Sequence, residues 1–371
     1  MRQLIRGALR LQRSTVPKAA AAAVAAFSSS ATEASATHAF DRSLKRLQRD
    51  NAARAHHAWQ PVENKDEQAH EIVDYDYIQT EIAARLVDRL EDIIRDEGFP
   101  LALDLGAGAG SVYRAICAED ALQRTGGGIG GVRKLVQLDS AGILLNRDAN
   151  VPFEDQDRCD SYRLQADEEG RLAFPDGTFD LVISSASMHW VNNLPALFKE
   201  ASRVLKPDGC FLLAMIGGTT LPELRASMVL AELEREGGVS PHVGPFVELP
   251  DVGALLQRAG FALPTLDTDT LTVAFPDAMV LMQHLQRMGE SNAGIKRRER
   301  TSLDTFLATA CLYDYNFGLT APEDGAVEIE ASVQVIYAIG WTPHESQQKP
   351  LKRGTATHKV GDMMVEHTKK E

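Results

Sequence analysis

Short apolar runs recur through the middle of the chain, and each is typical of a strand that is buried on both faces of a parallel sheet. They lie at residues 101–105, 135–138, 179–184 and 211–216. The segments between them are long enough for crossover helices, and strands that alternate with helices form sheets covered by helices on both faces. The pattern therefore predicts a doubly wound α/β sheet.

The segments on either side of this core show patterns of their own. Residues 75–96 are predicted to form a helix, because their apolar positions recur at helical spacing. These positions are Ile78, Ile82, Leu86, Leu90 and Ile93. After residue 217 we expect helices, a strand at 270–275 and a last β-rich run at 327–341. The predicted parts are a leader at 1–37, a basic and helical segment at 38–100, the α/β core at 101–216, a helical insertion with sheet-completing strands at 217–348, and a polar tail at 349–371.

The first 32 residues are basic and contain no acidic side chain. Arg2, Arg6, Arg10 and Arg13 alternate with leucine and isoleucine at the spacing of a basic amphipathic helix, and alanines and serines follow. Such a start is typical of a mitochondrial transit peptide, so we predict one at 1–37 and import into the mitochondrial matrix. A disordered tail is one alternative. A secretory signal is another, although the alanine stretch is only weakly hydrophobic.

Charge and composition exclude several classes of protein. The 371 residues carry a net charge of −13, which repels the phosphate backbone of nucleic acids, so we expect no nucleic-acid partner. No apolar run approaches the ~20 residues of a membrane-spanning helix, so we expect at most peripheral contact with a membrane. The four cysteines are too far apart in the sequence for a metal-ligand cluster, and we predict no metal site.

A glycine-rich loop follows the first predicted strand and precedes a predicted helix. Asp104, Gly106, Gly108 and Gly110 form the pattern D-x-G-x-G-x-G in this loop. Glycines let the backbone turn sharply and approach a ligand, and the start of a helix offers free N–H groups. A dinucleotide fingerprint fits less well, because it expects a small residue where Ser111 stands. We therefore predict S-adenosyl-L-methionine as the cofactor, with a tight turn without a ligand as the alternative.

Two acidic residues extend this predicted site. Asp139 ends the second strand, where a carboxylate accepts hydrogen bonds from ribose hydroxyls, and a glycine-rich insertion at 126–131 explains its distance from the loop. Asp167 follows the third strand position, and we expect it to bind the exocyclic amine of adenine. Either acid alone could be a helix cap or a surface residue. Because the carboxyl ends of parallel strands share one edge of the sheet, we expect the loop and both acids to form one site.

Several motifs resemble those of known proteins. Residues 174–182 (FPDGTFDLV) and 205–209 (LKPDG) are similar to signatures of class I S-adenosylmethionine-dependent methyltransferases. Closer similarity extends over most of the chain after the leader. It is carried by 40–46 (FDRSLKR), 188–192 (MHWVN), 234–238 (EREGG), 240–242 (SPH), 288–292 (MGESN), 339–341 (IGW) and 344–346 (HES). These motifs resemble the mitochondrial respiratory complex I assembly factor 5 family.

The resemblance implies a fold, a location and an activity. The implied fold is a Rossmann-like, mostly parallel seven-stranded sheet with N-terminal and C-terminal helical additions. The implied role is assembly of complex I (NADH:ubiquinone oxidoreductase). The implied location is the matrix, with at most peripheral contact with the inner membrane. The family is similar to the malonyl carrier-protein methyltransferases of biotin synthesis, but it is associated with hydroxylation of an arginine in the iron–sulfur subunit near the quinone site. The chain departs from the expected pattern at Ala107 and Ala109 and in its glycine-rich insertion.

Candidate catalytic residues follow the fourth predicted strand. Ser185, His189 and Trp190 are expected beside the reactive end of a bound cofactor, with Ser185 assigned to cofactor binding. His189 is a candidate base, and Trp190 is a candidate cover for the cofactor or a surface for a guest side chain. The alternative is that both residues only pack on the sheet. His242, in a loop rich in glycine and proline, is a second candidate with a structural turn as its alternative.

Three functions remain open from the sequence. The first is modification of a complex I subunit, for which only the resemblance implies hydroxylation, since no histidine lies in a His-x-Asp or His-x-Glu pattern of the kind that can hold non-haem iron. The second is methylation of a small acid, a carrier-bound thioester or a protein side chain. The third is a non-catalytic assembly chaperone that is stabilised by a bound nucleoside.

Overall fold

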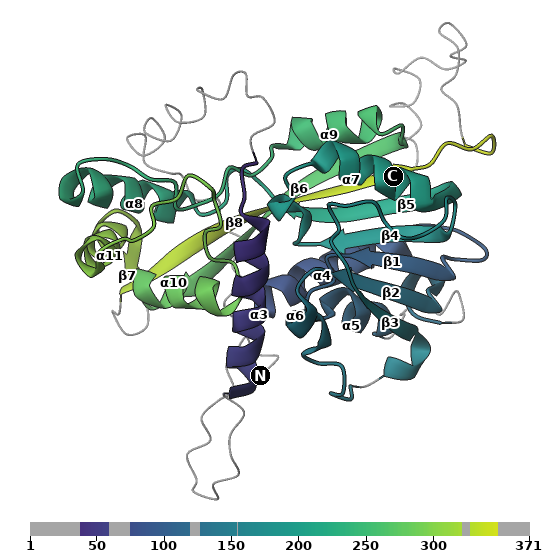
Figure 1. The fold of residues 1–371 in the computed structure, drawn as a ribbon, viewed down its shortest axis with the longest axis horizontal. Coiled ribbons are helices and arrows are strands. Elements are labelled where there is room, and N and C mark those ends of the chain that lie inside the picture. The colour runs from purple at the N-terminus through teal and green to yellow at the C-terminus, as the bar shows by residue number, and fades with distance from the viewer. Residues whose placement is uncertain (1–37, 59–74, 119–126, 154, 321–326, 348–371) are drawn as a thin grey trace, which may run out of the picture.

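One sheet organises the protein in the computed structural model, which describes residues 38–58, 75–118, 127–153, 155–320 and 327–347 (Figure 1). The strands in these ranges are β1 (Leu101–Leu105), β2 (Lys134–Asp139), β3 (Asp160–Gln165), β4 (Phe179–Ser185), β5 (Leu205–Ile216), β6 (Ala262–Phe275), β7 (Gly318–Thr320) and β8 (Val327–Trp341). Their order is β3-β2-β1-β4-β5-β8-β6, and β7 pairs with β8. The four predicted core strands are confirmed as β1, β2, β4 and β5.

Most of the sheet is parallel, as predicted. The neighbours from β3 to β5 all run parallel, whereas β8 is antiparallel to both β5 and β6. The prediction of seven strands is wrong by one in the described part of the chain, because β7 adds an eighth strand beside the end of β8. At three residues, β7 is too short to give a periodic signal in the sequence.

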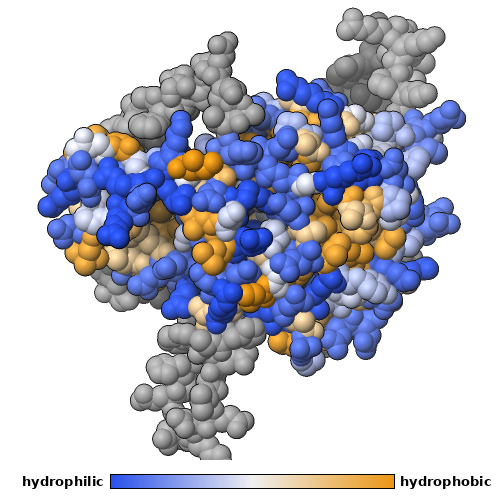
Figure 2. Space-filling view, in the orientation of Figure 1, coloured by the Kyte–Doolittle hydropathy of each residue, from blue (hydrophilic) through white to orange (hydrophobic). Residues whose placement is uncertain are grey.

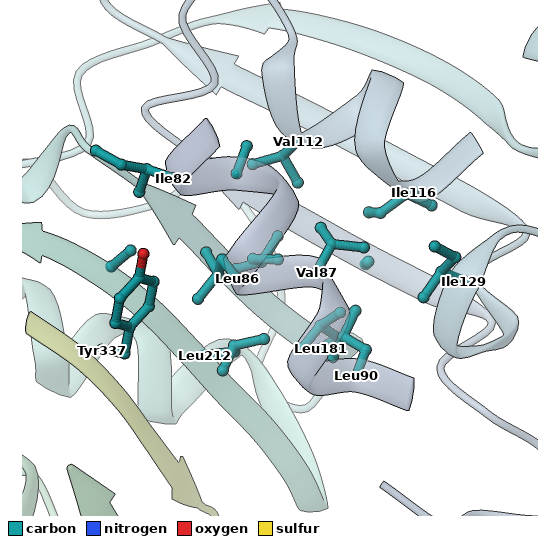
Figure 3. Close-up of a cluster of buried hydrophobic side chains, with 14 of the residues drawn as sticks. Ile82, Leu86, Val87, Leu90, Val112, Ile116, Ile129, Leu181, Leu212 and Tyr337 are labelled. Carbon is teal, nitrogen blue, oxygen red and sulfur yellow. The ribbon is translucent and has the colours of Figure 1, made fainter. Parts of the chain in front are cut away.

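Helices cover both faces of the sheet, which confirms the doubly wound arrangement. The helices are α3 (Arg42–Ala58), α4 (Tyr77–Glu91), α5 (Ser111–Cys117), α6 (Gly142–Asn146), α7 (Leu194–Val204), α8 (Pro222–Arg235), α9 (Leu249–Arg258), α10 (Ala278–Arg287) and α11 (Leu303–Phe317). Helices α4 and α5 pack on one face, and α7 and α9 pack on the other. Figure 3 shows the first layer, in which Leu86 of α4 lies between Val112 of α5 and Tyr337 of β8. The predicted helix at 75–96 corresponds to α4, which ends at Glu91.

The C-terminal half builds an extension beside the core. Strands β6 and β8 are 14 and 15 residues long, and their far ends carry α8, α10, α11 and β7 (Figure 1). A separate apolar cluster holds these elements together. It includes Leu221, Leu224, Met228, Phe275, Leu281, Tyr313 and Ile329. The predicted strand at 270–275 is the last part of β6, and the predicted run at 327–341 is β8. These two long strands join the extension to the core.

Helix α3 lies at the junction of the core and the extension, next to α6 and α10 (Figure 1). Its start is held by Asn192, whose side-chain oxygen accepts from the Phe40 N–H at 2.9 Å and whose amide donates to the Phe40 carbonyl at 3.1 Å. Further along the helix, Arg49 reaches Asp139 at the carboxyl end of β2. Helix α3 therefore covers the edge of the sheet at which the sequence places the ligand.

The predicted transit peptide at 1–37 and the polar tail at 349–371 lie outside the described residues. Within the described ranges, no helix combines the length and the apolar character needed to cross a membrane. On the face shown in Figure 2, hydrophilic residues predominate and hydrophobic residues form separate small groups.

Candidate active site

The glycine loop joins β1 to α5, and its backbone makes the turn that the sequence predicts. The N–H groups of Gly106 and Ala107 donate to the Leu138 carbonyl at 2.8 and 3.0 Å, which ties the loop to β2. Gly106 has a φ of +74°, and a Cβ atom there would lie 2.0 Å from the Ser187 hydroxyl oxygen. Only glycine fits this position.

Gly108 differs from Gly106 because open space adjoins it. Its φ is +55°, and the nearest atom to a Cβ built there is Leu144 Cδ2, at 4.0 Å. The open space is a cavity of about 500 Å³, which we call the glycine-loop cavity. Its walls are Arg49, Asp76, Gln79, Gly106, Ala107, Gly108, Ala109, Ser111, Val112, Leu144, Ser185, Ala186, Met288 and Glu290. Predicted residues Gly106, Gly108 and Ser185 therefore lie together, and the buried Ser185 hydroxyl has no hydrogen-bond partner in the described ranges. Gly110 begins α5 in the left-handed conformation.

Asp139 lies directly under this loop and is fully buried. Its carboxylate accepts hydrogen bonds from the N–H groups of Gly108 at 2.9 Å and Ala141 at 2.8 Å. The Arg49 guanidinium lies 3.5 Å from the same carboxylate. The structure thus brings Asp139 to the glycine loop, as the order of strands predicted.

Asp104 is buried below the glycine loop and does not line the cavity. Neither carboxyl oxygen has a hydrogen-bond partner among the described residues. Burial, reinforced by the nearby charge of Asp139, raises the pKa of Asp104 well above its ordinary value. The folded protein therefore holds a proton on Asp104 at pH values at which the unfolded chain has lost it.

This shift predicts how the stability of the ligand-free protein depends on pH. A raised pKa in an acid makes stability fall as the pH rises above about 4 and through the folded-state value. Asp104→Asn removes the charge, so at alkaline pH its free energy of unfolding should exceed that of the wild type by about 1 to 3 kcal/mol. At acid pH the two proteins should differ little. Urea unfolding across pH measures this. The exposed Asp88, changed to Asn, is the control, and equal pH slopes for Asp104→Asn and the wild type would contradict the prediction.

Asp167 lies beside the first residue of α3 and does not line the glycine-loop cavity. Its side chain is 60% exposed and accepts a hydrogen bond from Arg42 at 2.7 Å. Asp167, Arg42 and Ser140 belong to the walls of a second recess of about 600 Å³. Ser140 follows Asp139 directly, but within the residues described this recess shares no wall residue with the glycine-loop cavity, and the assignment of adenine to Asp167 stays a prediction.

A third cavity, of about 530 Å³, adjoins the glycine-loop cavity, and we call it the apolar cavity. Its walls are Ile78, Gln79, Ile82, Ala186, His189, Trp190, Ile216, Thr220, Leu221, Phe246, Leu285, Met288, Glu290 and Val333. Gln79, Ala186, Met288 and Glu290 belong to both cavities. The glycine-loop cavity and the apolar cavity therefore meet at a common wall whose charged member is Glu290.

Glu290 is the centre of a buried charged cluster. The Trp190 indole N–H donates to its Oε2 at 2.6 Å, and His189 Nε2 lies 3.6 Å from the same oxygen. Lys45 and Arg49 of α3 lie 4.0 and 3.5 Å from the carboxylate. Burial opposes the ionisation of Glu290, but the two cations and His189 outweigh it and lower its pKa to about 2. Glu290 is therefore a carboxylate at neutral pH.

His189 and Trp190 line the apolar cavity and not the glycine-loop cavity. One of the two roles considered for Trp190, covering the cofactor, is therefore corrected. The Trp190 ring faces Lys45, whose ammonium lies 3.5 Å from the ring centre, and it does not cover the glycine-loop cavity. Burial lowers the pKa of His189, and its Nδ1 atom has no partner among the described residues. A neutral imidazole beside the common wall can accept a proton.

His242 is not brought to the site, so we no longer include it among the candidate catalytic residues. It lines neither cavity, and its Nε2 atom lies 2.9 Å from Oε1 of Glu232 at the end of α8. Glu232 is fully buried and also accepts from the Ser240 N–H at 2.6 Å. The hydrogen bond to Glu232 supports the structural alternative for this histidine.

We expect His242→Ala to change stability and not ligand binding. Loss of the partner of a buried carboxylate should cost about 1 to 3 kcal/mol. Chemical unfolding and calorimetric titration with S-adenosylmethionine measure the two effects separately. A large loss of cofactor affinity in a folded His242→Ala protein would return this residue to the site.

Sequence reasoning missed three cations of α3 and Glu290, which two of them, Lys45 and Arg49, contact. Arg42, Lys45 and Arg49 recur at helical spacing, so the sequence could have placed them on one face of a helix. Glu290 lies in the MGESN motif, which was noted only as a resemblance. In the described part of the chain, no three His, Cys, Asp or Glu side chains are grouped closely enough to hold a metal ion.

Known proteins resemble both the core of this protein and nearly its whole length. A family model described as a methyltransferase domain matches residues 103–213. "Arginine-hydroxylase NDUFAF5, mitochondrial" of Rattus norvegicus is 42% identical, covering 90% of this chain and 86% of the relative. The Homo sapiens protein of that name is also 42% identical, covering 87% and 83%.

A second group of relatives is more distant. The malonyl acyl-carrier-protein O-methyltransferase of Halorhodospira halophila is 31% identical, covering 71% of this chain and 81% of the relative. Both the methyltransferase fold and the family resemblance expected from the sequence are confirmed by these matches. Given its identity with the rat and human proteins over most of their length, the chain belongs to the mitochondrial arginine-hydroxylase NDUFAF5 family.

Proposed function

We propose that this protein binds S-adenosyl-L-methionine and hydroxylates an arginine of the iron–sulfur subunit of complex I near the quinone site, during assembly of the complex. The proposed location is the mitochondrial matrix, with at most peripheral contact with the inner membrane. Membership in the arginine-hydroxylase family supports the reaction. The observation that carries the proposal is the common wall at which the glycine-loop cavity meets an apolar cavity beside the ionised Glu290.

The residues present fit the proposed cofactor. Gly108 leaves room in the glycine-loop cavity, and Ser185 offers a buried hydroxyl without a hydrogen-bond partner in the part of the chain that the structure describes. We assign the ribose hydroxyls to Asp139, which ends β2, is buried beneath the cavity wall and accepts a hydrogen bond from the Gly108 N–H. When bound, S-adenosylmethionine supplies a sulfonium centre with an electrophilic methyl group.

The apolar cavity is our proposed site for the substrate side chain. Ile78, Ile82 and Leu285 can pack against the methylene groups of an arginine. A guanidinium donates charge-assisted hydrogen bonds to a carboxylate, and Glu290 offers Oε1 for one such bond, because Trp190 donates to Oε2 and Arg49 lies 3.5 Å from Oε1. Hydroxylation inserts oxygen into a C–H bond and needs an oxidant. The part of that reaction that these residues can perform is to bind the arginine, fix its orientation and exclude water.

Methylation is the alternative that a specific observation favours. His189 is a neutral imidazole in the pocket wall and can remove a proton from a substrate group that attacks the methyl carbon. The malonyl-carrier methyltransferase relative is consistent with such chemistry on this fold. A non-catalytic chaperone is the remaining alternative, in which the bound nucleoside only stabilises the native state.

Mass spectrometry of the iron–sulfur subunit separates the three functions. The subunit would be isolated from cells with and without this protein, and from cells that carry Gly108→Val. Our proposal expects an arginine that gains the mass of one oxygen only when the intact protein is present. A methyl group instead would favour the alternative enzyme. Normal modification in its absence, combined with failed assembly, would favour the chaperone.

A further inference from the structure

We infer that Arg49 binds the α-carboxylate of the methionine half of S-adenosylmethionine. This inference rests on the proposed function, because it takes the glycine-loop cavity as the cofactor site. It assigns a role to a residue of α3 that lies far in sequence from the methyltransferase-like core at 103–213.

Arg49 is a buried cation without a close partner. Its side chain is 8% exposed, yet its ion-pair contacts with Asp139 and Glu290 are both 3.5 Å long. Its contact with the Ser187 hydroxyl is 3.4 Å, and its Nε atom has no partner among the described residues. Charge-assisted hydrogen bonds between such groups are usually about 2.7 to 2.9 Å long.

Arg42, on the same helix, makes closer ion pairs than Arg49, although its Nε atom also has no hydrogen-bond partner among the described residues. Its Nη2 atom lies 2.7 Å from Asp167 and 2.8 Å from Glu168. The long contacts of Arg49 are therefore a property of its position and not of α3 as a whole. They leave its donors available to an anion in the cavity.

The position of Arg49 indicates which part of the cofactor this anion is. Arg49 lies between Asp139, the proposed ribose acceptor, and Glu290 at the common wall. In S-adenosylmethionine the sulfur and the amino-acid half follow the ribose, so a ligand held at Asp139 brings its amino-acid half past Arg49. A carboxylate is the group of that half that matches the planar guanidinium in charge and geometry.

Other basic residues do not offer the same contact. Arg49 is the one Lys or Arg among the described residues that line the cavity. Lys45 is close by, but its ammonium donates to the carbonyls of Gly289 at 3.1 Å and Ser291 at 2.7 Å. It therefore serves to hold the chain around Glu290, while Arg49 faces the ligand.

A four-way comparison by calorimetry tests the inference with binding as its readout. The ligands are S-adenosylmethionine and decarboxylated S-adenosylmethionine, which differ only by the carboxylate. The proteins are the full chain as wild type and as Arg49→Gln, with Arg54→Gln as a control on an exposed part of α3. The wild type should prefer the carboxylated ligand by about tenfold or more, as expected of a hydrogen bond to a charged group.

In Arg49→Gln this preference should shrink to about twofold or less, while Arg54→Gln keeps the preference of the wild type. Equal weakening of both ligands would overturn the inference and leave Arg49 as a positioning residue for Asp139. Should Arg49→Gln not fold, the comparison of the two ligands on the wild type still decides, since equal affinities would overturn the inference. A wild type that binds neither ligand would reject the proposed cofactor itself, and with it this role for Arg49.

Discussion

Gly108→Val is expected to abolish binding of S-adenosylmethionine while the sheet stays folded. The valine side chain would project into the glycine-loop cavity, since Leu144 Cδ2, at 4.0 Å, is the one atom beyond the neighbouring residues that the described structure places within 4 Å of the Cβ position. The backbone φ of +55° adds a cost of about 1 to 3 kcal/mol for a non-glycine residue. Calorimetric titration should show no saturable heat at ligand concentrations that saturate the wild type.

Gly177 offers a control that separates strain from occlusion. Its φ is +63°, and the nearest atoms to a Cβ placed there are also 4.0 Å away. It belongs to the turn before β4 and lines neither cavity. Gly177→Val should therefore cost similar stability and leave cofactor affinity within about twofold. Equal loss of binding in both variants would show that strain, not occupation of the cavity, explains the effect.

Gly108→Val also distinguishes an enzyme from a chaperone in cells. If cofactor chemistry is required, cells that carry only Gly108→Val should accumulate unassembled complex I even at normal levels of the protein. If the protein is a chaperone, assembly should recover once the abundance of the variant is restored. A folded Gly108→Val protein that cannot bind the nucleoside, yet supports full modification and assembly, would defeat the proposed function.

The sequence predicted the core of the sheet because its strands are buried on both faces. The runs that became β1 and β4 contain few polar residues, so burial alone identifies them. The first half of β6 was missed for the opposite reason. It lies at the edge of the sheet and contains Pro264, Asp267 and Asp269, residue types that are depleted in strands. These two acids pair with Arg89 and Arg85 of α4, a contact that only the folded chain brings together.

The site was predictable where it follows the order of the strands and not where it depends on docking. Asp139 and Gly108 meet because β1 and β2 are neighbours, and the strand-end rule anticipates this. The encounter of Arg49 with Glu290 depends on how α3 packs against the loop after α10. For His242 the sequence suggested a catalytic role that packing removes. Its imidazole is hydrogen-bonded to Glu232 of α8, a contact that the sequence of the loop does not indicate.

Glu290→Gln is expected to abolish arginine modification while cofactor binding persists. The variant keeps the shape of the side chain and removes the charge that a guanidinium would pair with. A hydrogen bond between charged groups contributes about 1.5 to 3 kcal/mol, so binding of an arginine peptide should weaken about tenfold to a hundredfold. Affinity for S-adenosylmethionine should persist and weaken less than affinity for the peptide, because Asp139 and the glycine loop are untouched, although Glu290 also lines the glycine-loop cavity and contacts Arg49.

Peptides with arginine or citrulline at the target position isolate the effect of the charge. The wild type should prefer arginine, whose guanidinium is charged, over citrulline, whose urea group is neutral. Glu290→Gln should lose that preference. Glu232→Gln is the matched control, because Glu232 is also buried and hydrogen-bonded but lines neither cavity. If Glu290→Gln retains the preference of the wild type, another residue must recognise the guanidinium.

The pH dependence of this binding follows from the cluster. With a pKa of about 2, Glu290 stays ionised at every pH at which the protein would be assayed. Burial lowers the pKa of Lys45 to about 7, although Glu290 opposes the shift. As the pH rises through about 7, Lys45 loses its positive charge and neutralises Glu290 less. The wild type should therefore bind the arginine peptide more tightly above this pH than below it, and Lys45→Met should flatten the profile. If the affinity of the wild type for the arginine peptide fell with rising pH, Lys45 would not be the group that neutralises Glu290.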